Sequence, residues 1–173
     1  MKKNQRGALS MGNLMTVVML ALLAWVVFYP KYAQAKLRKD FNAAIEAGET
    51  IYNAAQRYYI QKGIWPSAMG DLSVNIDAKP VSAWEVASKV YSCQLSYGRG
   101  DQKRNEISCS PIGKFASVLS YQIVLADNSL HKRYCRATKT NQKANDMCKE
   151  IGGVFSHNVA GSATPTSVYV VQR

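Results

Sequence analysis

The sequence is poor in the residues that most often carry out catalysis or hold metal ions. It contains two histidines, His131 and His157, and neither lies in a spacing typical of a metal site or a catalytic triad. It has no glycine-rich phosphate-binding motif, because the glycines of its YGRGD stretch suit a turn. We therefore predict that the chain is not an enzyme and has no catalytic residue, no cofactor and no bound metal.

Acidic residues are also scarce. There are 11 Asp and Glu against 22 Lys and Arg, so the formal net charge is +11, and loss of Lys2, Lys3 and Arg6 would lower it by three. Such a charge attracts polyanions without specificity, and it also keeps an exported domain soluble. We favour solubility and keep DNA binding as an alternative. The candidate DNA contacts are Arg99, Lys103, Arg104, Lys132, Arg133 and Arg136.

One long apolar run, residues 14–29, lies near the N-terminus. Three cations precede it and Pro30 follows it, a pattern typical of an export or membrane-anchoring signal. As a helix, residues 9–29 would extend about 30 Å at about 1.5 Å per residue, which matches the hydrocarbon core of a bilayer. The segment is therefore expected to cross a membrane.

An amphipathic helical pattern continues beyond Pro30. Apolar and small residues recur at alternating intervals of four and three, which places them in one stripe along a helix, and Ile45, Tyr52 and Tyr59 widen this stripe. The stripe consists of Leu37, Phe41, Ala44, Gly48, Ile51, Ala55 and Tyr58, and the opposite, solvent-exposed face is predicted to carry Lys39, Asn42, Glu46, Glu49, Asn53 and Gln56. Because proline in an apolar stretch bends a helix more often than it ends it, we expect one long, kinked helix. It should end near Lys62 and Gly63, before Pro66.

The pattern then changes to that of an antiparallel sheet. We expect strands at residues 89–97 and 106–112, a second hairpin at residues 117–125 and 130–137, and a last strand at residues 167–172. Residues 141–151 suit a short helix that ends at Gly152 and Gly153. Residues 64–87 indicate an irregular connection with one helical turn.

All four cysteines, Cys93, Cys109, Cys135 and Cys148, follow the apolar run. An even number beyond an export signal indicates disulfides formed in an oxidising compartment. Three pairings are open, and we favour Cys93 with Cys109 and Cys135 with Cys148, because each pair encloses a short hairpin or a loop and helix. Loops of this size would stabilise the fold by about 3 kcal/mol each in the chain-entropy account. A four-cysteine zinc site is the weaker alternative, because the close paired spacing of such sites is missing.

The segments follow one another in a characteristic order. The chain begins with a charged leader and a small residue, continues with an apolar segment closed by proline and a long amphipathic helix, and ends with a sheet that contains the cysteines. In this order and register the chain resembles type IV pilins and type II secretion pseudopilins. The resemblance implies an α+β, pilin-like fold, with a long N-terminal helix packed on an antiparallel sheet. It covers nearly the whole chain: the stretch QRYYIQKGIWPSAMGDL resembles the end of the pilin helix, and the segment between Cys135 and Cys148 resembles the C-terminal disulfide-bounded region.

In these families a peptidase cuts after a glycine, the new amino terminus is methylated, and a glutamate lies five residues beyond the cut. Counting back from the proline that closes the apolar segment puts Ala8 before the cut, Leu9 first and Asn13 in the glutamate position. Counting from Gly7 puts Gly12 there instead. Neither register supplies the carboxylate that is thought to pair with the amino terminus of a neighbouring subunit. Asn13 keeps a hydrogen-bonding group without the charge, so we expect a minor, tip-located or otherwise specialised subunit rather than the main filament protein.

The resemblance divides the chain into a leader (residues 1–8), a membrane and assembly half of the helix (9–30), an amphipathic half (31–63) and a head (64–173). Asn13 and Pro30 would act in assembly. It implies a single-pass protein of the bacterial inner membrane before assembly and a periplasmic or extracellular filament subunit afterwards. The expected partners are other pilin or pseudopilin subunits, prepilin peptidase and the inner-membrane assembly machinery. Adhesion, motility, DNA uptake and protein secretion all remain open.

A different class of protein fits the same N-terminal region. Ala33, Gln34 and Ala35 form an A-x-A site just beyond the apolar run, so the chain could be a secreted, disulfide-bonded binding domain with a cleavable signal peptide. The mass of the mature N-terminus separates the two interpretations. A start at Ala8 or Leu9 is expected for a filament subunit, and a start at Lys36 for the secreted domain.

Overall fold

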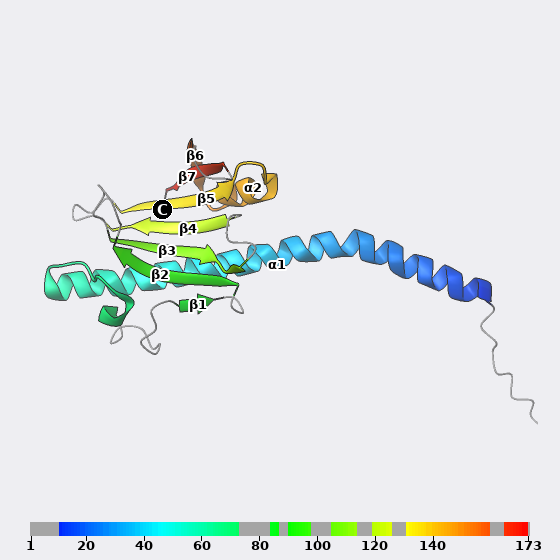
Figure 1. The fold of residues 1–173 in the computed structure, drawn as a ribbon, viewed down its shortest axis with the longest axis horizontal. Helices are drawn as coiled ribbons and strands as arrows, with labels where there is room; N and C mark the ends of the chain where they lie inside the picture. The colour runs from blue at the N-terminus through cyan, green and yellow to red at the C-terminus, as the bar shows by residue number, and fades with distance from the viewer. Residues whose placement is uncertain are drawn as a thin grey trace, which may run out of the picture. The chain divides into compact units, whose positions relative to one another are not determined.

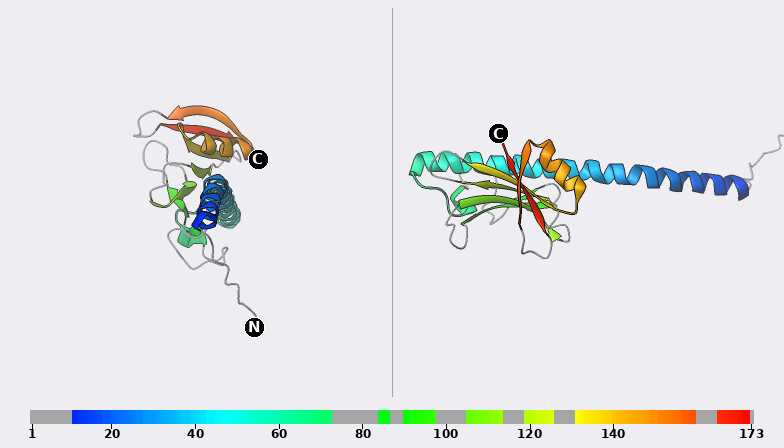
Figure 2. Two further views of the ribbon diagram at one scale, coloured as in Figure 1. Left: turned by 90° about the vertical axis from the view of Figure 1, so that its right-hand side faces the viewer. Right: turned by 90° about the horizontal axis from the view of Figure 1, so that it is seen from above.

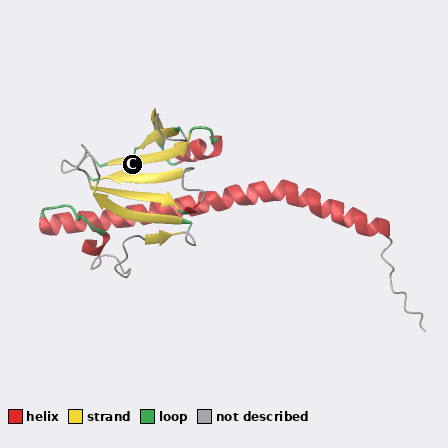
Figure 3. Ribbon diagram, in the orientation of Figure 1, coloured by secondary structure: helices red, strands yellow, loops and turns green. Residues whose placement is uncertain are grey.

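The computed structural model describes residues 11–72, 84–86, 90–97, 105–113, 119–125, 131–159 and 165–172. The chain divides into two compact units, Met1–Leu37 and Arg38–Arg173. Helix α1 (Met11–Lys62) begins in the first unit and ends in the second, with Pro30 inside it (Figure 3). The predicted long helix through Pro30 is therefore confirmed.

The end of α1 lies where the sequence predicts it. Gly63 has a φ of 73° and donates its N–H to the carbonyl of Tyr59 at 2.8 Å. This left-handed conformation suits glycine because it has no Cβ, and it satisfies a carbonyl at the helix end. A short 3-10 helix, η1 (Met69–Leu72), follows and buries Met69 and Leu72.

The second unit contains one sheet in which every described strand pairing is antiparallel (Figure 1). Its order is β1-β2-β3-β4-β5-β7-β6, so β6 at the edge comes before its neighbour β7 in sequence. The strands are β1 (Trp84–Val86), β2 (Tyr91–Tyr97), β3 (Asn105–Pro111), β4 (Leu119–Val124), β5 (Lys132–Thr138), β6 (Gly153–Val159) and β7 (Thr166–Val171). The fold class is therefore α+β.

The part of α1 within the second unit lies along one face of this sheet (Figures 1 and 2). Its predicted apolar stripe is the buried one: Phe41, Ala44, Gly48, Ile51 and Ala55 are buried. In β2, β3, β4 and β5, alternate residues face this stripe, because side chains alternate across a strand. The strand contribution includes Tyr91, Cys93, Leu95, Ile107, Cys109, Leu119, Tyr121, Ile123, Cys135 and Ala137.

At Gly48 the helix lies close against the sheet. A Cβ at this position would lie 3.1 Å from Cys109 Sγ and 3.4 Å from the ring of Tyr121. Because both atoms belong to the packed core, a larger residue would push the helix away from the sheet. The glycine of the predicted stripe thus has a steric role.

The four longer predicted hairpin strands and the last strand are all present, displaced by one or two residues at their ends. Two strands were not predicted. β1 is three residues long. β6 begins at Gly153, the second of the two glycines expected to end the helix, and a register shift between Phe155 and His157 breaks the alternation that a sequence pattern needs.

Candidate functional site

The described part of the first unit presents a continuous apolar helix surface. From Leu14 to Tyr32, its large apolar side chains are at least 51% exposed. By length and composition, α1 is therefore long and apolar enough to cross a membrane. Trp25 and Tyr29 stack on one another at 5.3 Å between ring centroids.

The predicted processing and assembly residues fall at the start of this helix. Gly7, Ala8 and Leu9 lie outside the described residues. Asn13 is in the first turn of α1 with an exposed side chain, and its carbonyl accepts a hydrogen bond from the Thr16 hydroxyl at 2.9 Å. Asn13 therefore places a polar group among the apolar side chains at the N-terminal end of α1.

In the second unit, a mostly buried ion pair joins α1 to the sheet. Arg133 Nε lies 2.8 Å from Glu49 Oε1, and its Nη2 lies 2.9 Å from Oε2, so the contact is bidentate. The Tyr121 hydroxyl donates to Glu49 Oε1 at 2.7 Å, and the guanidinium carbon lies 5.0 Å from the centre of the Tyr52 ring. Hydrogen bonding to Glu49 raises the pKa of Arg133, while burial opposes this rise.

This pair bears on two sequence predictions and corrects the first. Glu49 was expected on the solvent-exposed face of α1, but its side chain is 20% exposed and points to β5. The candidate DNA contact Arg133 lies on the α1 side of the sheet, where its charge pairs with Glu49. The spacing of apolar residues predicts which face of a helix is buried, but it does not predict that Glu49 at the border of that face pairs with Arg133, 84 residues away in the sequence.

Aromatic rings and His131 surround the end of α1. Tyr59 stacks on Trp65 at 4.5 Å, and the His131 ring contacts Trp65 at 5.3 Å and Tyr52 at 5.1 Å. Burial, and then the charge of Arg133, lower the pKa of His131. His131 is therefore packed between two aromatic rings of the head.

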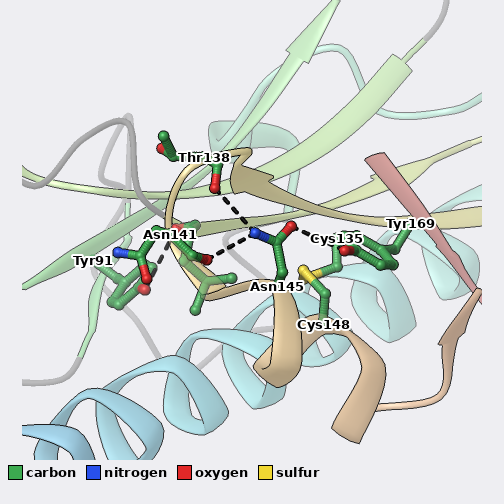
Figure 4. Close-up of a disulfide and its surroundings, with 8 residues drawn as sticks. Tyr91, Cys135, Thr138, Asn141, Asn145, Cys148 and Tyr169 are labelled. Carbon is green, nitrogen blue, oxygen red and sulfur yellow. Dashed lines mark hydrogen bonds between the residues drawn. A yellow bond between two sulfur atoms is a disulfide. The ribbon is translucent and has the colours of Figure 1, made fainter. Parts of the chain in front are cut away.

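The C-terminal disulfide region is held by a second polar centre. Helix α2 (Gln142–Glu150) begins at the N-cap Asn141, whose side chain accepts from the N–H of Ala144 at 3.1 Å. The buried Asn145 amide donates to the carbonyls of Thr138, Lys139 and Asn141, and its oxygen accepts from the Tyr169 hydroxyl at 2.9 Å. Figure 4 shows Asn145 between these groups and beside the disulfide.

Both predicted disulfides are present. Cys93–Cys109 joins directly paired residues of β2 and β3, and Cys135–Cys148 joins β5 to α2. The second disulfide fastens α2 to the face of the sheet that α1 also covers, because Cys135 and Arg133 share one face of β5. Among the described residues there is no group of three side chains that could hold a metal ion.

A groove lies between α1 and the end of α2, with a volume of about 540 Å³. We call it the α1–α2 groove; its lining includes Asn42, Glu46, Glu49, Thr50 and Asn53 of α1 and Ile151 after α2. An exposed ion pair, Arg38–Glu150 at 2.6 Å, also links the two helices. Within the described chain, the Glu46 carboxylate has no hydrogen-bond or ion-pair partner.

The remaining candidate DNA contacts are divided. Lys132 and Arg136 are exposed on the face of β5 that points away from α1, with the half-buried Tyr134 between them. Residues 98–104, which include Arg99, Lys103 and Arg104, lie outside the described residues. The structure thus places Lys132 and Arg136 on one face of β5 and Arg133 on the other.

No family model, curated protein or solved structure matches this chain.

Proposed function

We propose that this chain is a structural subunit, minor or tip-located, of a type IV pilus or a type II secretion pseudopilus. The observation that carries the proposal is α1 itself. Its N-terminal part exposes an unbroken apolar surface, and the same helix continues into a folded, disulfide-bonded head. A membrane anchor alone would not require a helix that also forms the core of the head.

The physical argument concerns what covers that surface. Each large apolar side chain left in water forgoes about 1.5–3 kcal/mol of burial free energy, and α1 exposes a long series of them. In the proposed function, lipid covers these side chains before assembly, and the helices of other copies cover them in the filament. Helix packing of this kind depends on close van der Waals contact.

Asn13 bears on the type of subunit. A carboxylate in an apolar helix core needs a compensating cation, whereas an amide needs only a hydrogen-bond partner. Asn13 can therefore be buried without an amino terminus beside it, which suits a specialised position in the filament.

The secreted-domain alternative places a cut after Ala35. In the structure this position lies inside α1, and the cut would remove the whole exposed apolar series while leaving Arg38–Arg173 intact. DNA binding remains a second candidate function, because Lys132 and Arg136 are exposed together. If the chain binds DNA through its phosphates, the affinity for DNA should fall as the salt concentration is raised, and Arg136→Ala should lower this affinity further.

The test is expression of the full chain in a bacterium that assembles such a filament, followed by intact-mass measurement and recovery of sheared filaments. We expect a mature chain that starts at Ala8 or Leu9, carries a methyl group and appears in the filament fraction. A mature chain that starts at Lys36 overturns the proposal.

A charge placed in the apolar series tests the assembly step separately. Leu20→Arg puts a cation where the wild-type side chain is 65% exposed, at a cost of about 2.5–3.5 kcal/mol in a bilayer core, and should abolish recovery in filaments. Gln56→Arg makes a similar change on the exposed face of α1 in the head and should leave recovery unchanged. Equal recovery of the two variants would contradict the role of the apolar surface.

A further inference from the structure

The α1–α2 groove is an anionic feature on a strongly cationic protein. The net charge is +11, yet the groove presents the uncompensated carboxylate of Glu46 beside the carboxamides of Asn42 and Asn53. The other carboxylate that lines it, Glu49, already pairs with Arg133. The groove therefore offers one free negative charge and several hydrogen-bond acceptors.

The shape of the groove limits what can enter it. Its volume of about 540 Å³ is within the range of ligand pockets, and Ile151 adds an apolar wall. A planar cation with an apolar stem matches both properties: the stem contacts the isoleucine while the guanidinium meets the carboxylate. An arginine side chain has this chemistry.

The same chain carries an exposed arginine on its opposite side. Arg136 alternates with Cys135 and Ala137, which are buried on the α1 face, so it points away from α1. Lys132 lies on the same face, with Tyr134 between the two cations. Arginine and tyrosine are the residue types that most often contribute strongly to protein interfaces.

We propose that the α1–α2 groove of one copy receives Arg136 of a second copy, where it pairs with Glu46. This inference rests on the proposed function, because it names the contact between neighbouring subunits of the filament. Charge complementarity favours this occupant: mature copies, whose charge is three below the +11 of the full chain, still repel one another unless a cation of one meets an anion of the next.

The arrangement of the two surfaces also matters. Groove and arginine lie on opposite faces of one sheet, so a copy that uses its groove still presents Arg136 to another copy. A contact between two different surfaces can repeat without closing into a dimer, which is the requirement for a filament.

The first experiment uses two co-expressed full-length chains with different tags, one with Glu46→Cys and the other with Arg136→Cys. Within one chain these positions lie on opposite sides of the head and cannot be joined, so a disulfide between the tags reports contact between copies. We expect a mixed dimer in the filament fraction. Each variant alone should give no dimer, and a dimer from either variant alone would indicate a different contact and overturn the proposal.

The second experiment exchanges the charges. Glu46→Arg and Arg136→Glu should each lower recovery in filaments by about tenfold or more, because each places like charges together, and the double exchange should restore it to within about threefold of wild type. Lys143→Glu makes the same charge change as Arg136→Glu at an exposed position of α2 and should leave recovery unchanged. All these side chains are exposed, so the detergent-solubilised variants should keep the wild-type melting temperature.

The outcomes separate this inference from the proposed function. If wild-type chains enter filaments but the mixed dimer is absent and the exchange gives no rescue, the groove contact is wrong and the filament role stands. If Arg136→Glu abolishes DNA binding and the double exchange does not restore assembly, the arginine serves DNA and the contact is also wrong. If the wild-type chain never enters a filament, both fail together.

Discussion

The buried ion pair between Glu49 and Arg133 should make a large contribution to the stability of the head. Glu49→Gln removes the charge but keeps a similar shape, and Glu46→Gln makes the same change three residues earlier, at an exposed position of α1. Breaking a buried pair typically costs about 3–5 kcal/mol, and a hydrogen bond to a charged group contributes about 1.5–3 kcal/mol. Because the two side chains are 20% and 15% exposed, we expect a loss near the lower values, about 2–3 kcal/mol.

The assay is thermal unfolding of the full chain in detergent micelles, followed by near-ultraviolet circular dichroism. For a folded unit of this size, about 1 kcal/mol corresponds to about 3–4 °C, so Glu49→Gln should lower the melting temperature by about 6–12 °C. Glu46→Gln should change the free energy of unfolding by less than about 0.5 kcal/mol.

A double-mutant cycle tests the cause of the loss. If the pair is responsible, Glu49→Gln combined with Arg133→Gln should cost less than the sum of the single changes by at least about 1 kcal/mol. Strictly additive losses, or equal melting temperatures for Glu49→Gln and Glu46→Gln, would refute the reasoning.

Three further predictions concern other parts of the head. Gly48→Val should destabilise it by about 1–3 kcal/mol through overpacking, measured by urea unfolding, whereas Gly70→Val, which has open space around its Cβ position, should cost less. Asn145→Ala should cost about 2–3 kcal/mol and hasten proteolysis of the disulfide region, because it removes the hydrogen bonds that the amide donates to three carbonyls and takes away the partner of the buried Tyr169 hydroxyl; unchanged proteolysis would contradict this. Because burial and a neighbouring arginine lower the pKa of His131 in the folded state, the unfolded chain binds its proton more readily, so stability should fall as the pH drops below about 6.5. His131→Phe should flatten this dependence in urea midpoints at several pH values and His157→Asn should not, and an equal slope in both variants would exclude His131.

Local patterns in the sequence determine several elements of this protein. The apolar run and the alternating spacings of three and four predict α1 through Pro30, and Gly63 marks its end because only glycine readily adopts that backbone conformation. The alternation of apolar and polar residues likewise predicts the hairpins, and the short loops between cysteines predict the two local disulfides. These features depend on neighbours a few residues apart, so the order of residues is sufficient to define them.

Tertiary structure decides what depends on distant partners. Glu49 has the spacing of a solvent-facing residue, and only the position of β5 against α1 turns it into a buried partner of Arg133. Edge strand β6 is defined by its pairing with β7, because buried and exposed residues do not alternate along it. The α1–α2 groove exists because the Cys135–Cys148 disulfide holds α2 beside α1 on the same sheet face, and no spacing along the chain specifies that distance.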